Sequence, residues 1–309
     1  MSELAIRAER LTKRYGEMAA VDGVDLAIPA GQFFGLLGPN GAGKTTTIHM
    51  LSTLIRPTAG EAWVAGHAVR AEPLAVRASI GVVFQENALD RTLTVAENLR
   101  FAGRLHGLAG SEIRQRGDEL LELFTLSARR DQPVGALSGG MRRALDIARG
   151  VIHHPRILFL DEPTIGLDLP NRRAIWRYIA QLRANLGITV FLTTHYLEEA
   201  VDCDEVAFLS SGRIVQTGAP RLLIEQLGRW IVEVETEQPA EIARKLAPRL
   251  GPPLIEADRV HFRCEHEQGE LGSLQSELAN LARAVRWRRP NLNDVFLWVN
   301  RTEPVRKAA

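Results

Sequence analysis

A glycine-rich stretch near residue 40 constrains the fold of this chain more than any other feature. Gly38–Thr45 reads Gly-Pro-Asn-Gly-Ala-Gly-Lys-Thr, which fits the phosphate-binding loop pattern of a glycine, four free positions and Gly-Lys-Ser/Thr. Residues 32–37 form an apolar run typical of a short buried strand, and residues 46–55 carry apolar side chains at helical spacing. Because strand, glycine-rich turn and helix form the context of this motif, the stretch predicts a site for nucleotide phosphates.

The chemistry of this loop follows from its residue types. Glycines let successive backbone N–H groups point inward at an anion, and a helix N-terminus adds partial positive charge. The ammonium of Lys44 is expected to reach the β- and γ-phosphates, and the hydroxyl of Thr45 is expected to ligate Mg²⁺. The alternative, a glycine-rich turn before a helix with no ligand, is disfavoured by the length of the match.

The composition is that of an ordinary globular protein, with 45% hydrophobic and 24% charged residues among 309. A net charge of +1 provides no chain-wide attraction to nucleic acid or anionic lipid, and we expect no nucleic-acid partner. The two cysteines, Cys203 and Cys264, make no metal or disulfide pattern. We expect neither a secretion signal at the N-terminus nor a membrane span, since no apolar run approaches about 20 residues.

Alternation of strands and helices predicts an α/β fold with a mostly parallel core sheet. Short apolar runs at residues 80–84, 157–160 and 188–192 are typical of strands covered on both faces. Residues 4–29 are strand-like, and residues 61–69 resemble a hairpin around Ala65-Gly66. Together they predict an antiparallel subdomain.

Helical regions interrupt and follow this sheet. Residues 93–150 have helical spacing, which predicts a helical insertion, and residues 172–186 form a helix that ends at Gly187. We expect a nucleotide-binding domain over residues 1–225 and a small α+β accessory domain over residues 226–309. The accessory domain has a predicted order of roughly βαβαβ with a helical tail. Its expected strands are residues 230–236, 259–264 and 285–287, and its expected helices are residues 242–250, 271–281 and a stretch from residue 292.

A strand that ends in two carboxylates is the second nucleotide element. Residues 157–160 lead directly into Asp161 and Glu162. Asp161 is expected beside the phosphate loop, where it can hold Mg²⁺, and Glu162 is expected to polarise the attacking water as a general base. A solvated acidic pair at a strand end is the alternative, and the phosphate loop in the same chain argues against it.

The stretch Leu137-Ser138-Gly139-Gly140-Met141 distinguishes between classes of phosphate-loop protein. Ser138 has the position of an N-cap, the glycines expose backbone N–H groups, and residues 141–152 read as a helix. With this stretch, the chain resembles the nucleotide-binding subunit of an ATP-binding cassette (ABC) transporter, since Leu-Ser-Gly-Gly matches the signature motif of that family. The resemblance covers about the first 220 residues.

The resemblance assigns further residues and cofactors, namely ATP and Mg²⁺. Tyr15 resembles the aromatic residue that stacks on adenine, Gln85 the glutamine that senses Mg²⁺ and water, and His195 the histidine that contacts the γ-phosphate. Asp168 ends a Gly-Leu-Asp stretch that resembles the loop crossing the dimer interface in this family. The expected catalytic residues are Glu162, His195 and Gln85, and the expected metal ligands are Thr45, Gln85 and Asp161. The expected nucleotide contacts are Tyr15, Gly38, Pro39, Asn40, Gly41, Ala42, Gly43, Lys44, Thr45, Thr46, Ser138, Gly139, Gly140 and Asp168.

The family resemblance also implies partners. Its members form head-to-tail dimers in which the phosphate loop of one subunit and the signature motif of the other enclose each ATP. ATP binding closes the dimer, hydrolysis opens it, and the motion passes to an integral membrane permease from the cytoplasmic face of the membrane. The groove beside residues 86–94 is expected to receive a short cytoplasmic helix of that permease.

Two positions depart from the widest family pattern, and three stretches narrow the resemblance to one branch. Met141 stands where Gln is usual, and Ile165 where Ser is common, but neither change removes a catalytic group. The stretches 141–143, 194–200 and 290–297 resemble the drug-resistance, or ABC-2 type, export ATPases. We therefore expect an export ATPase. The alternatives are a soluble ABC ATPase that acts on ribosomes or DNA, disfavoured by the single cassette and near-neutral charge, and a regulator without turnover, disfavoured by Glu162 and His195.

Overall fold

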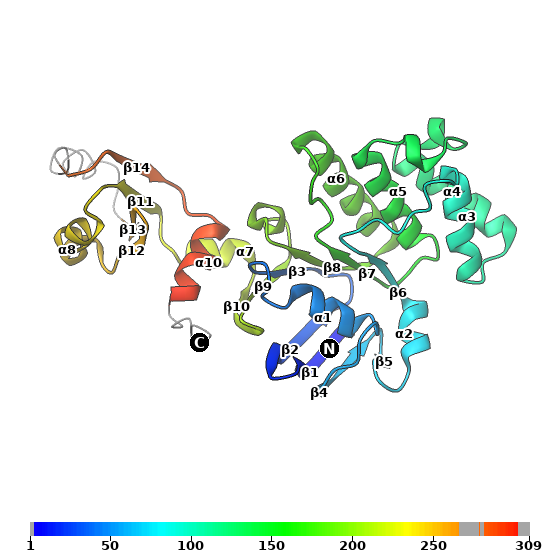
Figure 1. Ribbon diagram of the computed structural model, residues 1–309, viewed down its shortest axis with the longest axis horizontal. Helices are drawn as coiled ribbons and strands as arrows, with labels where there is room; N and C mark the ends of the chain where they lie inside the picture. Colours follow the sequence, from blue (N-terminus) through cyan, green and yellow to red (C-terminus); the bar gives the residue numbers. More distant parts are fainter. Residues whose placement is uncertain (1–2, 266–277, 279–280, 302–309) are drawn as a thin grey trace. The chain divides into compact units, whose positions relative to one another are not determined.

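The computed structural model describes residues 3–265, 278 and 281–301, which fall into two compact units. The first unit comprises residues 1–196 and 203–217, and the second comprises residues 197–202 and 218–309 (Figure 1). Along the chain, the strands and α-helices of the first unit are β1 (Leu4–Tyr15), β2 (Met18–Pro29), β3 (Phe33–Leu37), α1 (Lys44–Leu51), β4 (Ala59–Val64), β5 (His67–Ala68), α2 (Pro73–Ser79), β6 (Ile80–Val83), α3 (Val95–Leu105), α4 (Gly110–Leu123), α5 (Gly139–Val151), β7 (Ile157–Asp161), α6 (Leu169–Leu186), β8 (Thr189–Thr194), β9 (Glu205–Ser210) and β10 (Arg213–Gly218).

A six-stranded sheet in the order β10-β9-β3-β8-β7-β6 forms the centre of the first unit. The pairs β3–β8, β3–β9, β6–β7 and β7–β8 are parallel, which confirms the predicted mostly parallel core. Every residue of β3, β7 and β8 is buried, as expected for strands covered on both faces. The register pairs Leu37 with Thr194 and Asp161 with Thr193, so the carboxyl ends of three strands lie at one edge.

A second sheet, in the order β2-β1-β4-β5, is the predicted antiparallel subdomain. The hairpin between β4 and β5 turns at Ala65 and Gly66, and both residues have positive φ angles (52° and 84°). A two-residue hairpin with positive φ at both central residues matches the right-handed twist of its strands. The predicted hairpin is therefore confirmed.

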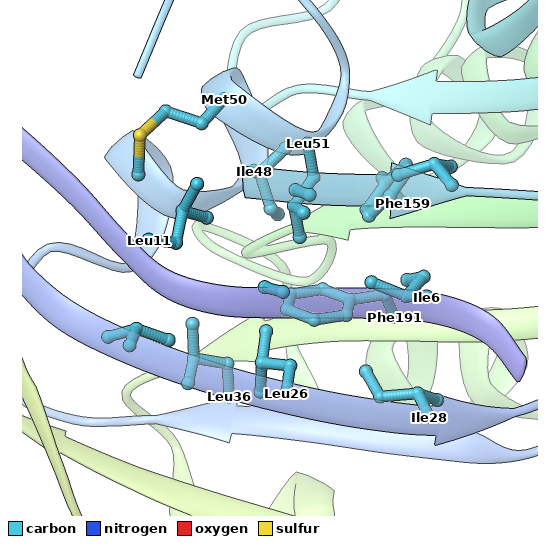
Figure 2. Close-up of a cluster of buried hydrophobic side chains, with 14 of the residues drawn as sticks. Ile6, Leu11, Leu26, Ile28, Leu36, Ile48, Met50, Leu51, Phe159 and Phe191 are labelled. Carbon is cyan, nitrogen blue, oxygen red and sulfur yellow. The ribbon is translucent and has the colours of Figure 1, made fainter. Parts of the chain in front are cut away.

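Helix α1 lies between the two sheets of the first unit and supplies part of their shared core (Figure 1). Figure 2 shows Ile48, Met50 and Leu51 of α1 gathered with side chains of β1, β2 and the core sheet, including Phe159 and Phe191. All five named side chains are completely buried. This packing fixes the helix that follows the phosphate loop relative to the strand ends.

The predicted helical insertion contains α3, α4 and α5, which pack on one another. Thr94 and Glu97 form a capping box at the start of α3, and Ser138 caps α5 through the backbone N–H of Met141. Helix α6 begins at Leu169, three residues before the predicted start, and ends at Gly187 with a left-handed φ of 63°. Helix α2 and the strands β9 and β10 are elements that the sequence patterns do not predict.

The second unit is built on a four-stranded sheet in the order β12-β13-β11-β14. Helix α8 and the sheet share a core that includes Val232, Ile242 and Phe262. Strand β12 was not predicted, and the predicted helix at residues 271–281 falls mostly outside the described residues. In the part of the chain that is described, no helix is both long and apolar enough to cross a membrane. The elements of this unit are α7 (Pro220–Glu225), β11 (Trp230–Glu235), α8 (Pro239–Leu250), β12 (Leu254–Glu256), β13 (Arg259–Cys264), β14 (Ala284–Arg288) and α10 (Leu292–Arg301), with short 3₁₀ turns elsewhere in the chain.

Candidate nucleotide site

The phosphate loop joins the end of β3 to the start of α1 at the carboxyl edge of the core sheet. Gly43 precedes the helix with a φ of 108°, and a Cβ at this position would lie 2.3 Å from the carbonyl oxygen of Ala20. A side chain is therefore excluded there by both backbone conformation and space. No acidic residue occupies the first turn of α1, so its partial positive charge faces the loop.

Lys44 is the buried cation of this loop. Its side chain is 5% exposed, and its Nζ donates hydrogen bonds to the carbonyl oxygens of Gly38 at 2.8 Å and Pro39 at 3.1 Å. The same atom lies 3.4 Å from Oε1 of Glu162. The ammonium therefore sits at the centre of the loop, in contact with the carboxylate that follows β7.

Asp161 and Thr45 meet beside the loop. The hydroxyl of Thr45 donates to Oδ1 of Asp161 at 3.2 Å, and the hydroxyl of Thr193 donates to the same oxygen. Asp161 is only 2% exposed. A carboxylate and a hydroxyl in contact are oxygen ligands of the kind that Mg²⁺ uses together with substrate phosphates and water. Among the described residues, no group of three or more His, Cys, Asp or Glu side chains is arranged to hold a metal ion alone. The residues present thus fit Mg²⁺ that is also bound by phosphate.

Glu162 and His195 complete the edge of the site. Oε1 of Glu162 lies 3.1 Å from Nδ1 of His195, close enough for an ion pair but without the angle of a hydrogen bond. Glu162 is 9% exposed and has a positive φ of 47°, which is rare for a residue with a side chain. Its backbone N–H donates to the carbonyl oxygen of Thr193 at 3.0 Å. Strand β8 thus fixes the peptide that carries the carboxylate.

The signature residues lie at the start of α5 and show a different environment. Ser138 and Gly139 are exposed, and the hydroxyl of Ser138 accepts a hydrogen bond from the N–H of Met141 at 3.2 Å. Gly140 is buried because Asn171 covers it; a Cβ at Gly140 would lie 2.2 Å from Oδ1 of that residue. In the described part of this chain, the contacts of Ser138 stay within its own helix and do not reach Lys44.

The remaining predicted site residues lie at three other places. Tyr15 ends β1, is 49% exposed, and has Nζ of Lys13 at 5.2 Å from its ring centroid. Asp168 caps α6 by accepting a hydrogen bond from the N–H of Asn171 at 2.9 Å. Gln85 is exposed and follows the end of β6. Tyr15, Gln85 and Asp168 are therefore all exposed to solvent, and Asp168 also stabilises the start of α6.

Two residues of this region were not found by the sequence analysis. Thr193 binds Asp161, and the buried Arg143 of α5 donates to backbone carbonyls of residues 161–163. The signal for Arg143 was present in the sequence, since Asp146 follows it at a spacing of three on an otherwise apolar helix face. The threonine carried no such signal, because its role depends on the register of β7 against β8.

Comparison with known proteins shows which family this chain is related to. The ABC transporter family profile matches residues 21–165. The chain is 43% identical to the daunorubicin resistance ATP-binding protein DrrA2 of Streptomyces coeruleorubidus, over 96% of this chain and 95% of that protein. It is 41% identical to the Nod factor export ATP-binding protein I of Ralstonia nicotianae, over 94% and 92% of the two chains.

A solved structure supports the same placement. The dimeric structure of an ATP-binding cassette in a post-hydrolysis state, bound to ADP and Pi, is 28% identical to this chain with a TM-score of 0.63. The similarity covers 69% of this chain and 98% of that one. The fold and the phosphate loop thus define a nucleoside-triphosphatase. The chain belongs to the family of ABC transporter ATP-binding proteins, and it is an ATPase whose hydrolysis of ATP drives transport.

Proposed function

We propose that this ATPase energises export through a separate integral membrane permease, from the cytoplasmic face of the membrane. The observation that carries the proposal is similarity to export and resistance ATPases along nearly the whole chain, C-terminal region included. An accessory domain over residues 226–309 is part of this proposal. The test is isolation of the intact complex from membranes: co-purification with an integral membrane protein is expected, and co-purification with ribosomes or nucleic acid instead would contradict it.

The chemistry within one subunit is divided among the residues at the sheet edge. Lys44 binds the β- and γ-phosphates, and Thr45, Asp161 and Gln85 hold Mg²⁺, which supplies charge neutralisation on the phosphates when bound. Glu162 accepts the proton of the attacking water, and His195, whose Nδ1 lies 3.1 Å from Oε1 of Glu162, contacts the γ-phosphate. Burial of Glu162 limits the positions that its carboxylate can adopt.

Adenine recognition and the dimer interface complete the proposed site. The exposed ring of Tyr15 is available to stack on adenine, and residues 38–46 contact the phosphates. Ser138, Gly139 and Gly140 bind the γ-phosphate of ATP held by a second subunit, and Asp168 lies at the same interface. The exposure of Ser138 and Gly139 at a helix N-terminus supports this geometry, as does the dimeric structure of the related cassette.

A mixing experiment tests whether Ser138 acts on the partner subunit. Ser138→Arg and Lys44→Ala each remove one half of every site in a homodimer, whereas a mixed dimer keeps one intact composite site. We expect ATP-driven dimerisation, measured by light scattering, to recover partly in the mixture and to be absent in both parents. Failure of the mixture, with both variants folded, would contradict the head-to-tail arrangement.

The segment of residues 86–94 is proposed to contact the permease. Ala88 is exposed, and Leu89 and Leu93 are half-buried, so the segment offers apolar surface beside Gln85. Asp90 is a poor probe of this contact, because its carboxylate accepts hydrogen bonds from the N–H of Thr92 at 2.8 Å and from its hydroxyl at 2.6 Å. A change at Asp90 would alter the loop itself.

Leu89→Glu is therefore the informative substitution. We expect it to weaken co-sedimentation with permease-containing membranes about tenfold while the ATPase rate of the isolated subunit stays within about twofold. Leu222→Glu, at an exposed leucine of α7, is the matched control and should change neither property. Unchanged membrane association of Leu89→Glu would place the docking surface elsewhere.

A further inference from the structure

A buried arginine connects the signature helix to both catalytic segments of the first unit. Arg143 lies in the second turn of α5 and is 4% exposed. A guanidinium presents five N–H donors in a fixed planar fork, so a buried arginine specifies the positions of the acceptors around it. The acceptors around Arg143 are backbone carbonyl oxygens from two different strand ends.

The first group of acceptors surrounds Glu162. Nε of Arg143 donates to the carbonyl oxygen of Pro163 at 2.6 Å, and Nη2 donates to those of Asp161 at 3.3 Å and Glu162 at 3.4 Å. Three consecutive carbonyls are therefore bound at the point where Glu162 has its positive φ of 47°. Such a conformation persists only where the surroundings over-determine it, and the guanidinium provides that restraint.

The second group of contacts lies on both sides of Gln85. Nη1 of Arg143 donates to the carbonyl oxygen of Phe84 at 2.5 Å, and it lies 3.6 Å from Oδ2 of Asp146. Asp146 is completely buried, and the backbone N–H of Ala88 lies near enough to lower the pKa of its carboxyl, against the larger effect of burial, which raises it. Residue 84 is thus held directly by Arg143, and Asp146, one turn further along the same helix, lies close to residue 88.

A second arginine shares the carboxylate of Asp146 but not the other contacts. Nη2 of Arg149 lies 3.0 Å from Oδ1 of Asp146, and its own side chain is 23% exposed. Burial raises the pKa of Asp146, while the two flanking guanidinium groups oppose that shift. Within the described residues, Arg149 forms no hydrogen bond with residue 84 or residues 161–163. A substitution at Arg149 therefore perturbs Asp146 without removing a contact to the catalytic segments.

We propose that Arg143 and Asp146 form a positioning pair that holds the Glu162 carboxylate and the Gln85 segment in register with the start of α5. The proposal rests on the roles proposed above for Glu162, Gln85 and Ser138. Ser138 is the N-cap of α5, so a shift of this helix when Ser138 meets ATP is carried by a rigid element to Arg143, and from there to both segments. The pair acts through other residues and touches neither phosphate nor water.

Substitutions on the pair separate positioning from binding and folding. In the full-length protein, Arg143→Gln removes the charge and most donors, and Arg143→Lys keeps the charge but loses the fork. Displacement of catalytic groups by about 1 Å costs about a hundredfold in rate. We expect kcat for ATP to fall tenfold to a hundredfold in Arg143→Gln and less in Arg143→Lys. The KM for ATP and the affinity for a fluorescent ATP analogue are expected to stay within twofold, because the phosphate loop is unchanged. Arg149→Gln is the control and should keep kcat within about threefold.

Further variants, measured beside Arg143→Gln, ensure that each result either supports or contradicts the positioning role. Asp146→Asn keeps the shape of its side chain, and it replaces Arg143→Gln if that variant does not fold; it should lower kcat at least fivefold at constant KM. The proposal is overturned if kcat survives, if kcat and ATP affinity fall together, or if Arg149→Gln loses as much activity as Arg143→Gln. Glu162→Gln is measured alongside. If Glu162→Gln turns over normally, the proposed catalytic roles fail, whereas a dead Glu162→Gln with an active Arg143→Gln rejects only the positioning pair.

Discussion

Both units of the molecule bury a cluster of charges, and the two clusters are built differently. In the first unit, Glu162 lies near one ammonium at 3.4 Å and one imidazole at 3.1 Å, at the edge of the sheet beside the phosphate loop. In the second unit, Arg288 binds both oxygens of Asp294 at 2.7 and 2.8 Å and contacts Glu233 at 3.3 Å.

The difference shows what distinguishes a reactive buried carboxylate from a structural one. Asp294 is fully buried and both of its oxygens are engaged in a bidentate contact, so little of its hydrogen-bonding capacity remains for a ligand. The side-chain contacts of Glu162 come from single atoms, and a positive φ turns its peptide at the strand end. Glu233 belongs to the same cluster as Asp294 because it contacts Arg288, so its expected role is structural. Glu162 has a similar exposure, 9% against 8% for Glu233, but its expected role is catalytic.

The largest expected effect is the loss of the cation in the first cluster. Lys44→Ala removes the ammonium that lies among the loop carbonyls, and charge-assisted hydrogen bonds contribute about 1.5–3 kcal/mol each. We expect nucleotide affinity to fall tenfold or more and steady-state hydrolysis to be lost, as measured by fluorescent-nucleotide titration and phosphate release. Unchanged affinity would mean that Lys44 does not face the phosphates.

The cation of the second cluster should behave in the opposite way. Arg288→Gln leaves Asp294 buried with its charge unpaired, which typically destabilises a protein by about 3–5 kcal/mol. We expect a large loss of stability in chemical denaturation, with the nucleotide affinity of the folded fraction unchanged. Arg263→Gln, at an exposed arginine of β13, is the control and should have little effect. If Arg288→Gln weakened nucleotide binding at full stability, the two clusters would not be separate in function.

A half-buried histidine of the first unit extends the comparison to the effect of pH. The ring of His153 stacks on His106 with centroids 3.6 Å apart, and its Nε2–H donates to the carbonyl oxygen of Ile80 at 3.0 Å. Burial lowers the pKa of His153 to about 4, with a smaller contribution from His106. Since the unfolded chain takes up this proton near pH 6.5, stability is complete above that pH and is lost progressively as pH falls toward 4.

Urea unfolding at pH 7.5 and 4.5 measures this effect. We expect the imidazole of His153 to account for about 2–3 kcal/mol of the acid destabilisation. His153→Gln keeps a donor for the carbonyl of Ile80 and does not titrate, so its stability should depend less on pH by that amount. An identical pH dependence in both proteins would show that His153 remains accessible to protons in the folded state.

Sequence patterns predict the features that depend on neighbouring residues and miss those that depend on distant ones. The core strands, the loop of residues 38–45 and the cap at Ser138 were predictable, because apolar runs, glycine spacing and capping residues are local signals. Strand β12, with three residues, and the contact between Thr193 and Asp161 depend on partners far along the chain. The spacing of Arg143 and Asp146 is a local signal, but the acceptors of Arg143 at residues 84 and 163 come together only through the parallel register of β6 and β7.

The most direct test of the central claim compares two isosteric substitutions in the same full-length protein. Glu162→Gln and Glu233→Gln each replace a buried carboxylate by an amide of the same shape. We expect Glu162→Gln to bind ATP normally, to accumulate as an ATP-stabilised dimer and to hydrolyse ATP at least about a hundredfold more slowly. Glu233→Gln should keep its turnover and lose stability instead. Near-normal hydrolysis by Glu162→Gln, measured as steady-state phosphate release, would contradict the assignment of Glu162 as the general base.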